Sequence, residues 1–137
     1  MNTSVNTLQT VKRKDKIIYY VTTGIIAVLM LVSAANFAFN EKYKTAFQHF
    51  GLPNWFRIEL TTAKFLGVLA LTIPGLPKLA KEFAYFGFAL TIISADVAHL
   101  SCGDSHWLVV AHTTFLGILA VSYVYYHKLL FVQAHAR

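Results

Sequence analysis

Cysteine and charge are both scarce in this 137-residue sequence. Cys102 is the only cysteine, which excludes an internal disulfide and a dithiol redox pair within one chain. Charged residues make up 13% of the chain and hydrophobic residues 56%, and the mean hydropathy of +0.53 is far from that of soluble domains. No H-E-x-x-H motif, cofactor fingerprint or nucleophile with a paired base occurs, so a stand-alone enzyme is the least favoured class. We predict an integral membrane protein.

Four apolar runs are long enough, or nearly so, to cross a membrane as helices, which takes about 20 residues. They cover residues 17–39, about 55–73, about 83–100 and about 108–126. Apolar residues surround nearly the whole circumference of each run, unlike a soluble amphipathic helix. The predicted fold is all-α, a four-helix transmembrane bundle over residues 17–128 with tails at 1–16 and 129–137. The first run lacks a cleavage site of small residues, so we expect it to remain as a membrane anchor.

Basic residues near the ends of the runs predict the orientation. Those before the first run, between the second and third, and after the fourth fall on one side: Lys12, Arg13, Lys14, Lys16, Lys78, Lys81, Lys128 and Arg137. Both termini are therefore expected to be cytoplasmic. Because these residues lie at segment ends, where lipid headgroups attract them, the net charge of +6 does not indicate nucleic-acid binding.

The first outer loop, "NEKYKTAFQHFGLPNWF", carries a helix signal of its own. Asn40 is a typical N-cap, aromatic residues recur at helical spacing, and Gly51 and Pro53 end the pattern. We predict a short helix lying in the outer membrane interface, with Trp55 and Trp107 at the headgroup level. An irregular loop with a few aromatic residues is an equal alternative.

Polar residues inside the runs all fall in the outer half of the membrane when depth is counted at about 1.5 Å per residue. The six that we predict as ligand-binding or proton-relay residues are Asn36, Glu59, Lys64, Asp96, His99 and His112. Ionisable residues within spans almost always face the bundle interior and pair with one another. Asp96 and His99 share a helix face, whereas Glu59 and Lys64 lie about 140° apart on theirs.

Two interpretations fit this group. Taken singly, each residue is better explained by a closed network that fixes helix register, with Lys64 joined to Asp96 or Glu59 and His99 as a donor. Four titratable groups together exceed what register needs, so the set favours a site. A metal fits less well because Lys64 adds an opposing charge, and haem between His99 and His112 has no motif. An organic ligand such as a quinone head or lipid headgroup fits best, and quinone reduction would give Asp96 and His99 a proton-transfer role.

The remaining polar features have simpler explanations. "CGD" at Cys102 to Asp104 is typical of a turn, although Cys102 is free to pair with another chain. His127 and His135 lie on the cytoplasmic side, and "SYVYYHK" is typical of an aromatic belt with a basic stop.

The stretch "ELTTAKFLGVLALTIPGLPKLAKEFAYFGFALTIISADVAHLSCGD", followed by "SYVYYHK", resembles the DoxX-like family of small four-helix bacterial membrane proteins. The likeness extends over about residues 16–128. It implies a bundle of four helices in the bacterial cytoplasmic membrane and matches the family pattern at Glu59, Lys64, Asp96 and His99. The name-giving relatives are small subunits of a thiosulfate:quinone oxidoreductase, and others associate with thiol or oxidative-stress enzymes.

The leading functional hypothesis is a small redox-associated subunit that binds a quinone or similar lipid in the outer half of the bundle. It would work with an oxidoreductase partner, and a homo-oligomer stays open although no G-x-x-x-G face occurs. Two other classes remain: a small proton-linked carrier, in which the buried charges form a relay, and a structural or assembly protein, in which they join helices.

Overall fold

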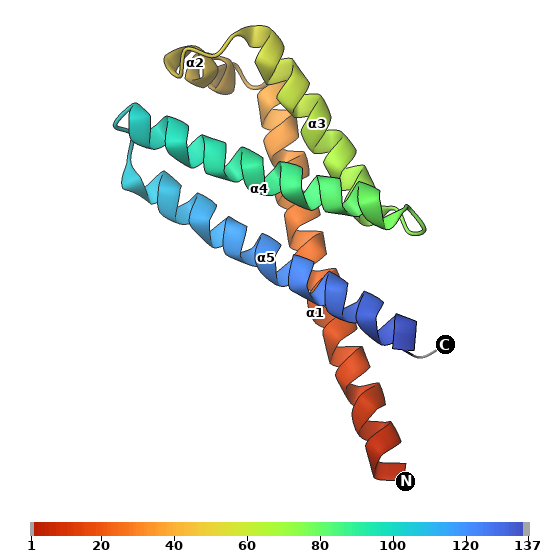
Figure 1. Cartoon of the computed structure of the whole chain (residues 1–137). Helices are drawn as coiled ribbons and strands as arrows, with labels where there is room; N and C mark the ends of the chain where they lie inside the picture. The colour runs from red at the N-terminus through yellow and green to blue at the C-terminus, as the bar shows by residue number, and fades with distance from the viewer. Residues whose placement is uncertain (1, 136–137) are drawn as a thin grey trace.

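The computed structural model describes the backbone of residues 2–135 and the side chains of residues 13–135, all of it helical apart from turns. The side chains of Lys12 and Arg137, which the orientation argument used, lie outside these ranges. Five helices follow one another along the chain (Figure 1): α1 Asn2–Phe39, α2 Glu41–His49, α3 Asn54–Thr72, α4 Lys78–Ser101 and α5 His106–His135. The predicted all-α class is confirmed.

The breaks between helices occur where the local sequence disfavours helix. Asn40 caps α2, its side chain accepting a hydrogen bond of 3.0 Å from the Lys42 backbone N–H, so the short helix predicted for the first loop is present. The turn between α3 and α4 lies between Pro74 and Pro77 and contains Gly75 at φ +81°. Gly103, at φ +72°, reverses the chain between α4 and α5. Glycine adopts this left-handed conformation without steric cost.

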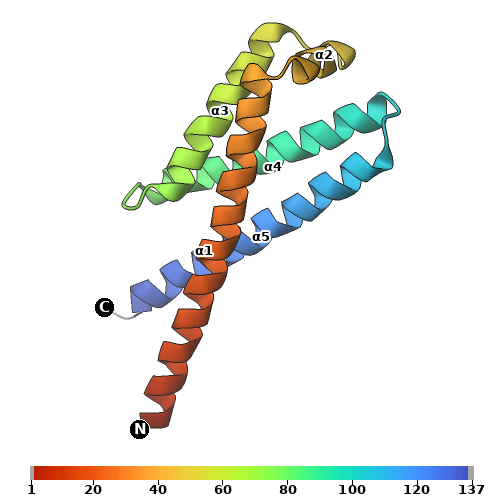
Figure 2. The same cartoon turned by 180° about the vertical axis from the view of Figure 1, so that it is seen from behind.

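The four long helices form two pairs that lie across one another. Figures 1 and 2 show α4 and α5 side by side, running in opposite directions, with α1 crossing them obliquely and α3 returning along α1. Helix α1 contacts α3 and α5, and α4 contacts α5 and α3. Where α3 meets α4, Gly67 lies under the Phe88 ring so closely that a Cβ there would be 2.6 Å from it.

A cluster of three buried hydroxyl groups joins α1, α4 and α5 at the centre of the fold. The Ser122 hydroxyl lies 2.8 Å from that of Thr23 and 2.7 Å from that of Tyr85. Ser122 is fully buried. Apolar side chains surround the cluster, among them Ile26 and Leu119, so the polar atoms satisfy one another in an interior that offers few other partners.

Much of the outer surface is hydrophobic, as expected for helices in a membrane. Three helical segments in the described range have the length and composition of membrane spans, namely Arg13–Phe39, Lys78–Ser101 and His106–His135. Helix α3 has 19 residues but is not among the three; its charged residues Arg57, Glu59 and Lys64 lower its hydropathy. That α3 is also a span, and that the helices form a four-span bundle, therefore stay predictions.

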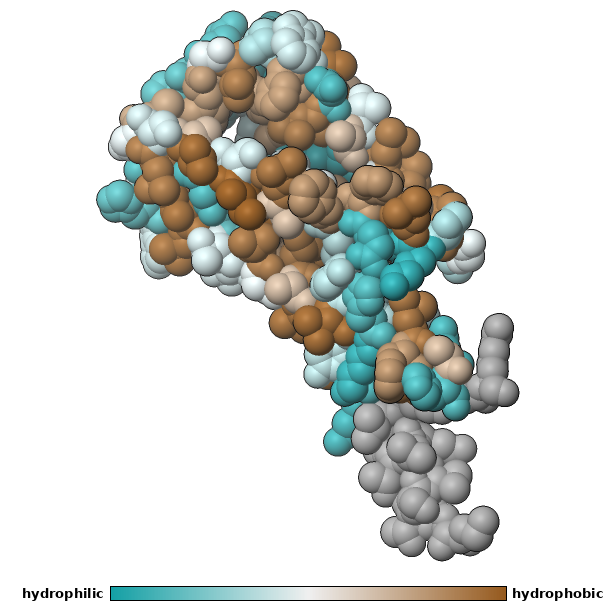
Figure 3. Space-filling model, in the orientation of Figure 1, coloured by the Kyte–Doolittle hydropathy of each residue, from teal (hydrophilic) through white to brown (hydrophobic). Residues whose placement is uncertain are grey.

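The molecule has two ends, and both carry polar side chains. At one, which we call the α2 end, lie α2 and the turn between α4 and α5 (Figure 1). At this end Arg57 of α3 donates to the carbonyls of Phe37 and Ala38 in the last turn of α1, which have no partner within their own helix. At the other, which we call the basic end, lie the turn between α3 and α4 and the last turns of α5. Figure 3 shows hydrophilic surface at both ends and mostly hydrophobic surface along the helices between them.

Candidate functional site

Asp96 and His112 join the adjoining ends of α4 and α5 near the α2 end. The His112 Nδ1 and Asp96 Oδ1 atoms are 2.8 Å apart. The side chains are 31% and 16% exposed, respectively. Because the turn at Gly103 makes the two helices antiparallel neighbours, residues 16 positions apart in sequence come to face each other. Both were predicted site residues, and the structure brings them into contact.

His99, one turn beyond Asp96, contacts an acid in the following turn of the chain. Its Nδ1 lies 2.8 Å from Asp104 Oδ2, and the other oxygen of Asp104 lies 3.3 Å from His49 Nε2 at the end of α2. The hydrogen bond from His99 lowers the pKa of the Asp104 carboxyl below its ordinary value, and the bond from His49 adds to the effect. Phe50 packs edge-on against the His99 ring, with centroids 4.9 Å apart.

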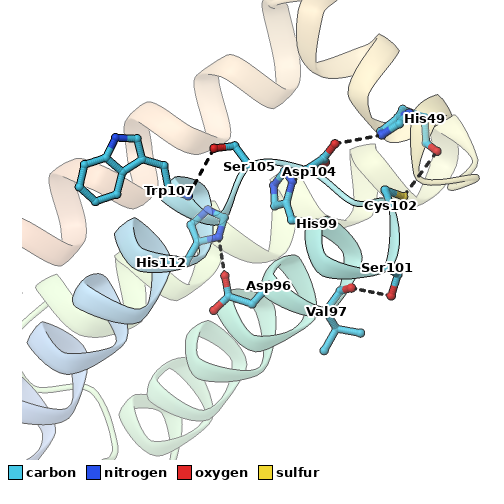
Figure 4. A network of polar contacts seen from close by, with 10 residues as sticks. All are labelled: His49, Asp96, Val97, His99, Ser101, Cys102, Asp104, Ser105, Trp107 and His112. Carbon is cyan, nitrogen blue, oxygen red and sulfur yellow. Dashed lines mark hydrogen bonds and ion pairs between the residues drawn. The ribbon is translucent and has the colours of Figure 1, made fainter.

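These contacts combine into one row of two acids and three imidazoles, drawn in Figure 4. The rings of His99 and His112 lie 5.6 Å apart between centroids, which places the two histidine–aspartate pairs next to each other. We call the row the acid–imidazole chain; its members, in spatial order, are Asp96, His112, His99, Asp104 and His49. It runs from the half-buried faces of α4 and α5 to the exposed ring of His49.

Lys64 of α3 is buried apart from the acid–imidazole chain. Only 5% of the residue is exposed. Its ammonium donates a 2.7 Å hydrogen bond to the Ser33 hydroxyl of α1 and lies 3.6 Å from the centroid of the Phe37 ring. The cation is thus held by a hydroxyl and an aromatic face, not by the carboxylates of Asp96 or Glu59 that the sequence offered as partners.

The other two predicted site residues lie away from these groups. Glu59 is exposed on α3. The Asn36 side-chain oxygen lies 3.5 Å from the Asn40 side-chain nitrogen, at the junction of α1 and α2. The six predicted residues therefore do not make one contact network.

Sequence reasoning missed His49 and Asp104, which belong to the acid–imidazole chain. Gly103 does form the predicted turn, but Asp104 also holds two histidines. His49 had been counted only as part of a short helix. The one available signal was the presence of His49 and Asp104 in the two loops assigned to the same side of the membrane.

The sequence analysis also overlooked ion pairs at the basic end. Lys128 of α5 lies 2.9 Å from Asp15 of α1, whose side chain is 6% exposed. His127, which the sequence analysis left without a role, has its Nε2 2.8 Å from Glu82 Oε1. Both pairs join residues on different helices, so spacing along one helix could not reveal them.

A cavity of about 470 Å³ lies between α4 and α5, nearer the basic end than the α2 end, with Glu82 and Tyr123 among its lining residues. Neither Lys64 nor any member of the acid–imidazole chain lines this cavity. Among the described residues, no group of three or more His, Cys, Asp and Glu side chains is placed to hold a metal ion.

Comparison with known proteins identifies the family. The model of the DoxX-like family matches residues 21–122, which include α2, α3 and α4 entirely and most of the hydrophobic part of α1. Searches of curated proteins and of solved structures gave no significant match. The match covers well over half of the chain and every member of the acid–imidazole chain. The protein is a small membrane protein that belongs to the DoxX-like family.

Proposed function

We propose that the chain crosses the bacterial inner membrane four times, with α3 as the second span and both termini in the cytoplasm. Two observations support this topology. The only charge in the middle of α3, that of Lys64, is buried in the fold and so does not face lipid. The basic residues Lys78, Lys81 and Lys128 gather at one end, as the positive-inside rule requires of the cytoplasmic side. Helix α2 then lies in the outer interface, beside the exposed Trp55 and Trp107.

The single cysteine provides a direct test of this orientation. Cys102 is exposed at the α2 end, so a membrane-impermeant maleimide should label it in cells whose inner membrane is intact. A Cys102→Ser/Lys78→Cys protein, with its thiol at the basic end, should react only after the membrane is permeabilised. The opposite pattern would place the termini outside and contradict the proposal.

We further propose that the protein is the small membrane subunit of a redox system, which binds a quinone or similar lipid at the α2 end. The observation that carries this proposal is the acid–imidazole chain. Imidazole changes its protonation state in the physiological pH range, and reduction of a quinone to a quinol takes up two protons along with two electrons. His112 and His99 are suited to hand over protons, while the carboxylates of Asp96 and Asp104 orient the rings and stabilise their charged forms.

The direction of the acid–imidazole chain fits this role. His49, with 54% of its side chain exposed, meets outer water, and Asp96 is the member least exposed. A proton would pass from His49 through Asp104 and His99, cross the gap to His112 by way of one water, and reach a ligand beside Asp96. Lys64, which contacts Ser33 and Phe37 and not these acids, would act on them only through its charge, and Glu59 would connect the site to outer water.

One cysteine cannot form a dithiol pair within the chain, and we propose that a partner oxidoreductase supplies the electrons. A partner oxidoreductase would therefore bind the subunit, or two copies would act together. Membrane lipid surrounds the exposed apolar faces in either case.

Mass spectrometry of organic extracts from gently solubilised protein tests the ligand assignment. The wild type should hold a quinone at close to one molecule per chain. The Asp96→Asn protein should retain about a tenth or less, because a charge-assisted hydrogen bond is lost. Glu41→Gln, an acid-to-amide change on the exposed face of α2, is the matched control and should retain the wild-type amount.

Two outcomes would contradict the assignment. Retention of the quinone by Asp96→Asn would show that the ligand does not depend on this carboxylate. A wild-type protein that folds but carries no quinone would favour a relay or a purely structural role. Proton-coupled uptake into proteoliposomes that is abolished by Asp96→Asn would then identify a carrier, and a loss of thermal stability alone would identify a structural network.

A further inference from the structure

Helix α2 is fixed to the α1–α3 pair by one buried aromatic side chain. Phe47 is 6% exposed. Its ring lies edge-on to that of Phe37 on α1, with centroids 4.9 Å apart, and its centroid is 6.5 Å from that of Phe56 on α3. Among the described helices, α2 packs closely on α1 and α3 and not on α4 or α5. These apolar contacts contain no titratable group, so α2 stays on the α1–α3 pair when the pH changes.

The α4–α5 pair meets α2 through a few side chains at the α2 end. Figures 1 and 2 show α3 and α4 diverging from the turn that joins them, with α2 lying toward the far end of α4. There His49 Nε2 lies 3.3 Å from Asp104 Oδ1 in the turn between α4 and α5 (Figure 4). The Phe50 ring packs on that of His99, and the Cys102 thiol lies 4.0 Å from the His49 carbonyl oxygen. His49 and Asp104 are thus the charged link between α2 and the α4–α5 pair.

The strength of this link depends on pH through the imidazole. The hydrogen bond from His99 lowers the pKa of the Asp104 carboxyl below its ordinary value, and the bond from His49 adds to the effect. Asp104 is therefore ionised throughout the range of about pH 5–8 in which imidazole titrates. A charged imidazole adds the attraction of opposite charges to its hydrogen bond with a carboxylate, and a neutral one does not. The link is therefore stronger at the acidic end of this range.

Most other ionisable groups at the α2 end are paired elsewhere. The pairs are Asp96 with His112, His99 with the second oxygen of Asp104, Lys44 with Glu41, and Arg57 with Asn54 and backbone carbonyls of α1. Lys42, Glu59 and His106 are exposed, and residues 21–39 of α1 include no ionisable side chain. His49 is thus the titratable group through which α2 reaches the α4–α5 pair.

We propose that His49 and Asp104 form a pH-sensitive clasp that holds the two helix pairs together at the α2 end. With His49 charged, the ion pair keeps the turn between α4 and α5 against α2. When His49 loses its proton, the turn moves away from α2 and the α4–α5 pair tilts from the α1–α3 pair. The hydroxyl contact of Thr23 with Ser122, which joins α1 to α5 at the centre of the fold, stays in place and acts as the pivot.

This inference rests on the proposed function in one respect: the site beneath the clasp is the quinone site. Asp104 also holds His99, so a proton that His49 passes inward leaves the clasp in its weaker, neutral form. The ligand site then opens after protons have reached the quinone. That is the moment at which the product, a quinol, has to leave the site.

Distances between two spin labels, measured by pulsed electron resonance, test the motion directly. On a Cys102→Ser background, the full-length protein carries labels at Thr45→Cys on α2 and Ala111→Cys on α5, both exposed positions. The protein is delipidated to remove any quinone and measured in nanodiscs at about pH 5 and about pH 8, the limits of imidazole titration. We expect the ratio of long to short distances to rise about fivefold at the higher pH, as the loss of an exposed ion pair predicts.

A reference pair and two matched variants identify the cause. Labels at Thr45→Cys and Thr62→Cys, which join α2 to α3, should give the same distance at both pH values. His49→Gln keeps a hydrogen-bond donor but cannot titrate, so it should abolish the pH response of the first pair. His106→Gln, the same change at an exposed histidine of α5, should retain it.

Two results would overturn the inference: a wild-type distance between α2 and α5 that does not change with pH, or a pH response that survives His49→Gln. Neither result depends on quinone, because none is present in the sample. Failure of the clasp therefore leaves the quinone assignment standing, and an empty protein whose clasp still opens would contradict the quinone assignment alone.

Discussion

Removal of the Ser122 hydroxyl tests the packing that holds the two helix pairs together. Ser122 lies on α5 and is 0% exposed. Its oxygen contacts the hydroxyls of Tyr85 on α4 at 2.7 Å and of Thr23 on α1 at 2.8 Å. Substitution by alanine deletes one atom and leaves both of these hydroxyl groups without their shared partner.

The expected loss follows from the number of bonds. Side-chain hydrogen bonds between transmembrane helices contribute about 0.6 kcal/mol on average and about 1.7 kcal/mol at most. Because Ser122 makes two such bonds, Ser122→Ala should lower the free energy of unfolding by about 1–3 kcal/mol. Tyr85→Phe removes one bond and should cost about half as much. In the double variant the two losses should not add, since they share the bond between Tyr85 and Ser122.

Reversible unfolding in mixed micelles, followed by far-UV circular dichroism, measures these free energies. Ser94→Ala is the control, because Ser94 is exposed on α4 and its loss should change little. If Ser122→Ala and Ser94→Ala both fell within about 0.5 kcal/mol of the wild type, or if the losses of Ser122→Ala and Tyr85→Phe were additive, the hydroxyl cluster would not join the helices as argued.

Two further predictions concern other contacts. Gly67→Ala should lower the free energy of unfolding by about 1–3 kcal/mol, because its Cβ would meet the Phe88 ring at 2.6 Å. Gly117→Ala is the control: its added Cβ has no neighbour within 4 Å, so it should stabilise the protein or leave it unchanged in the same measurement. An equal effect at both positions would refute the reasoning. The hydrogen bond from His99 lowers the pKa of Asp104 in the folded state. The ionised Asp104 carboxyl therefore stabilises the fold at pH values above its pKa in the unfolded chain, and this stabilisation is lost as the pH falls through its pKa in the folded protein. The difference in unfolding free energy between wild type and Asp104→Asn should therefore shrink on acidification, and a difference that is constant with pH would count against the bond.

The helices themselves were largely predictable, because their signals are local. Asn40 caps α2, and Pro74, Gly75 and Pro77 separate α3 from α4, as their backbone preferences dictate. Three of the four predicted hydrophobic runs lie in helices that have the length and hydropathy of membrane spans. That α3 is also a span stays a prediction, because its three charged residues lower its hydropathy.

The contacts of the candidate site were predictable only in part. Counting depth along each helix placed Asp96 and His112 in the same half of the membrane, and they do pair. The same method grouped Lys64 with these acids, although it points instead to Ser33 and Phe37. Depth is a property of one helix, whereas pairing also depends on how far each helix is rotated about its axis and on which neighbour it packs against.

The sequence by itself determined that this chain is an all-helical membrane protein of the DoxX-like family. Hydrophobicity, helix capping and turn formation depend on neighbouring residues, so they can be read along the chain. The tertiary structure alone decided that Asp104 bridges His99 and His49, that the hydroxyls of three helices meet at Ser122, and that a groove opens beside Glu82. Each of these requires segments distant in sequence to meet at a defined rotation and crossing, which only the packing of the whole fold sets.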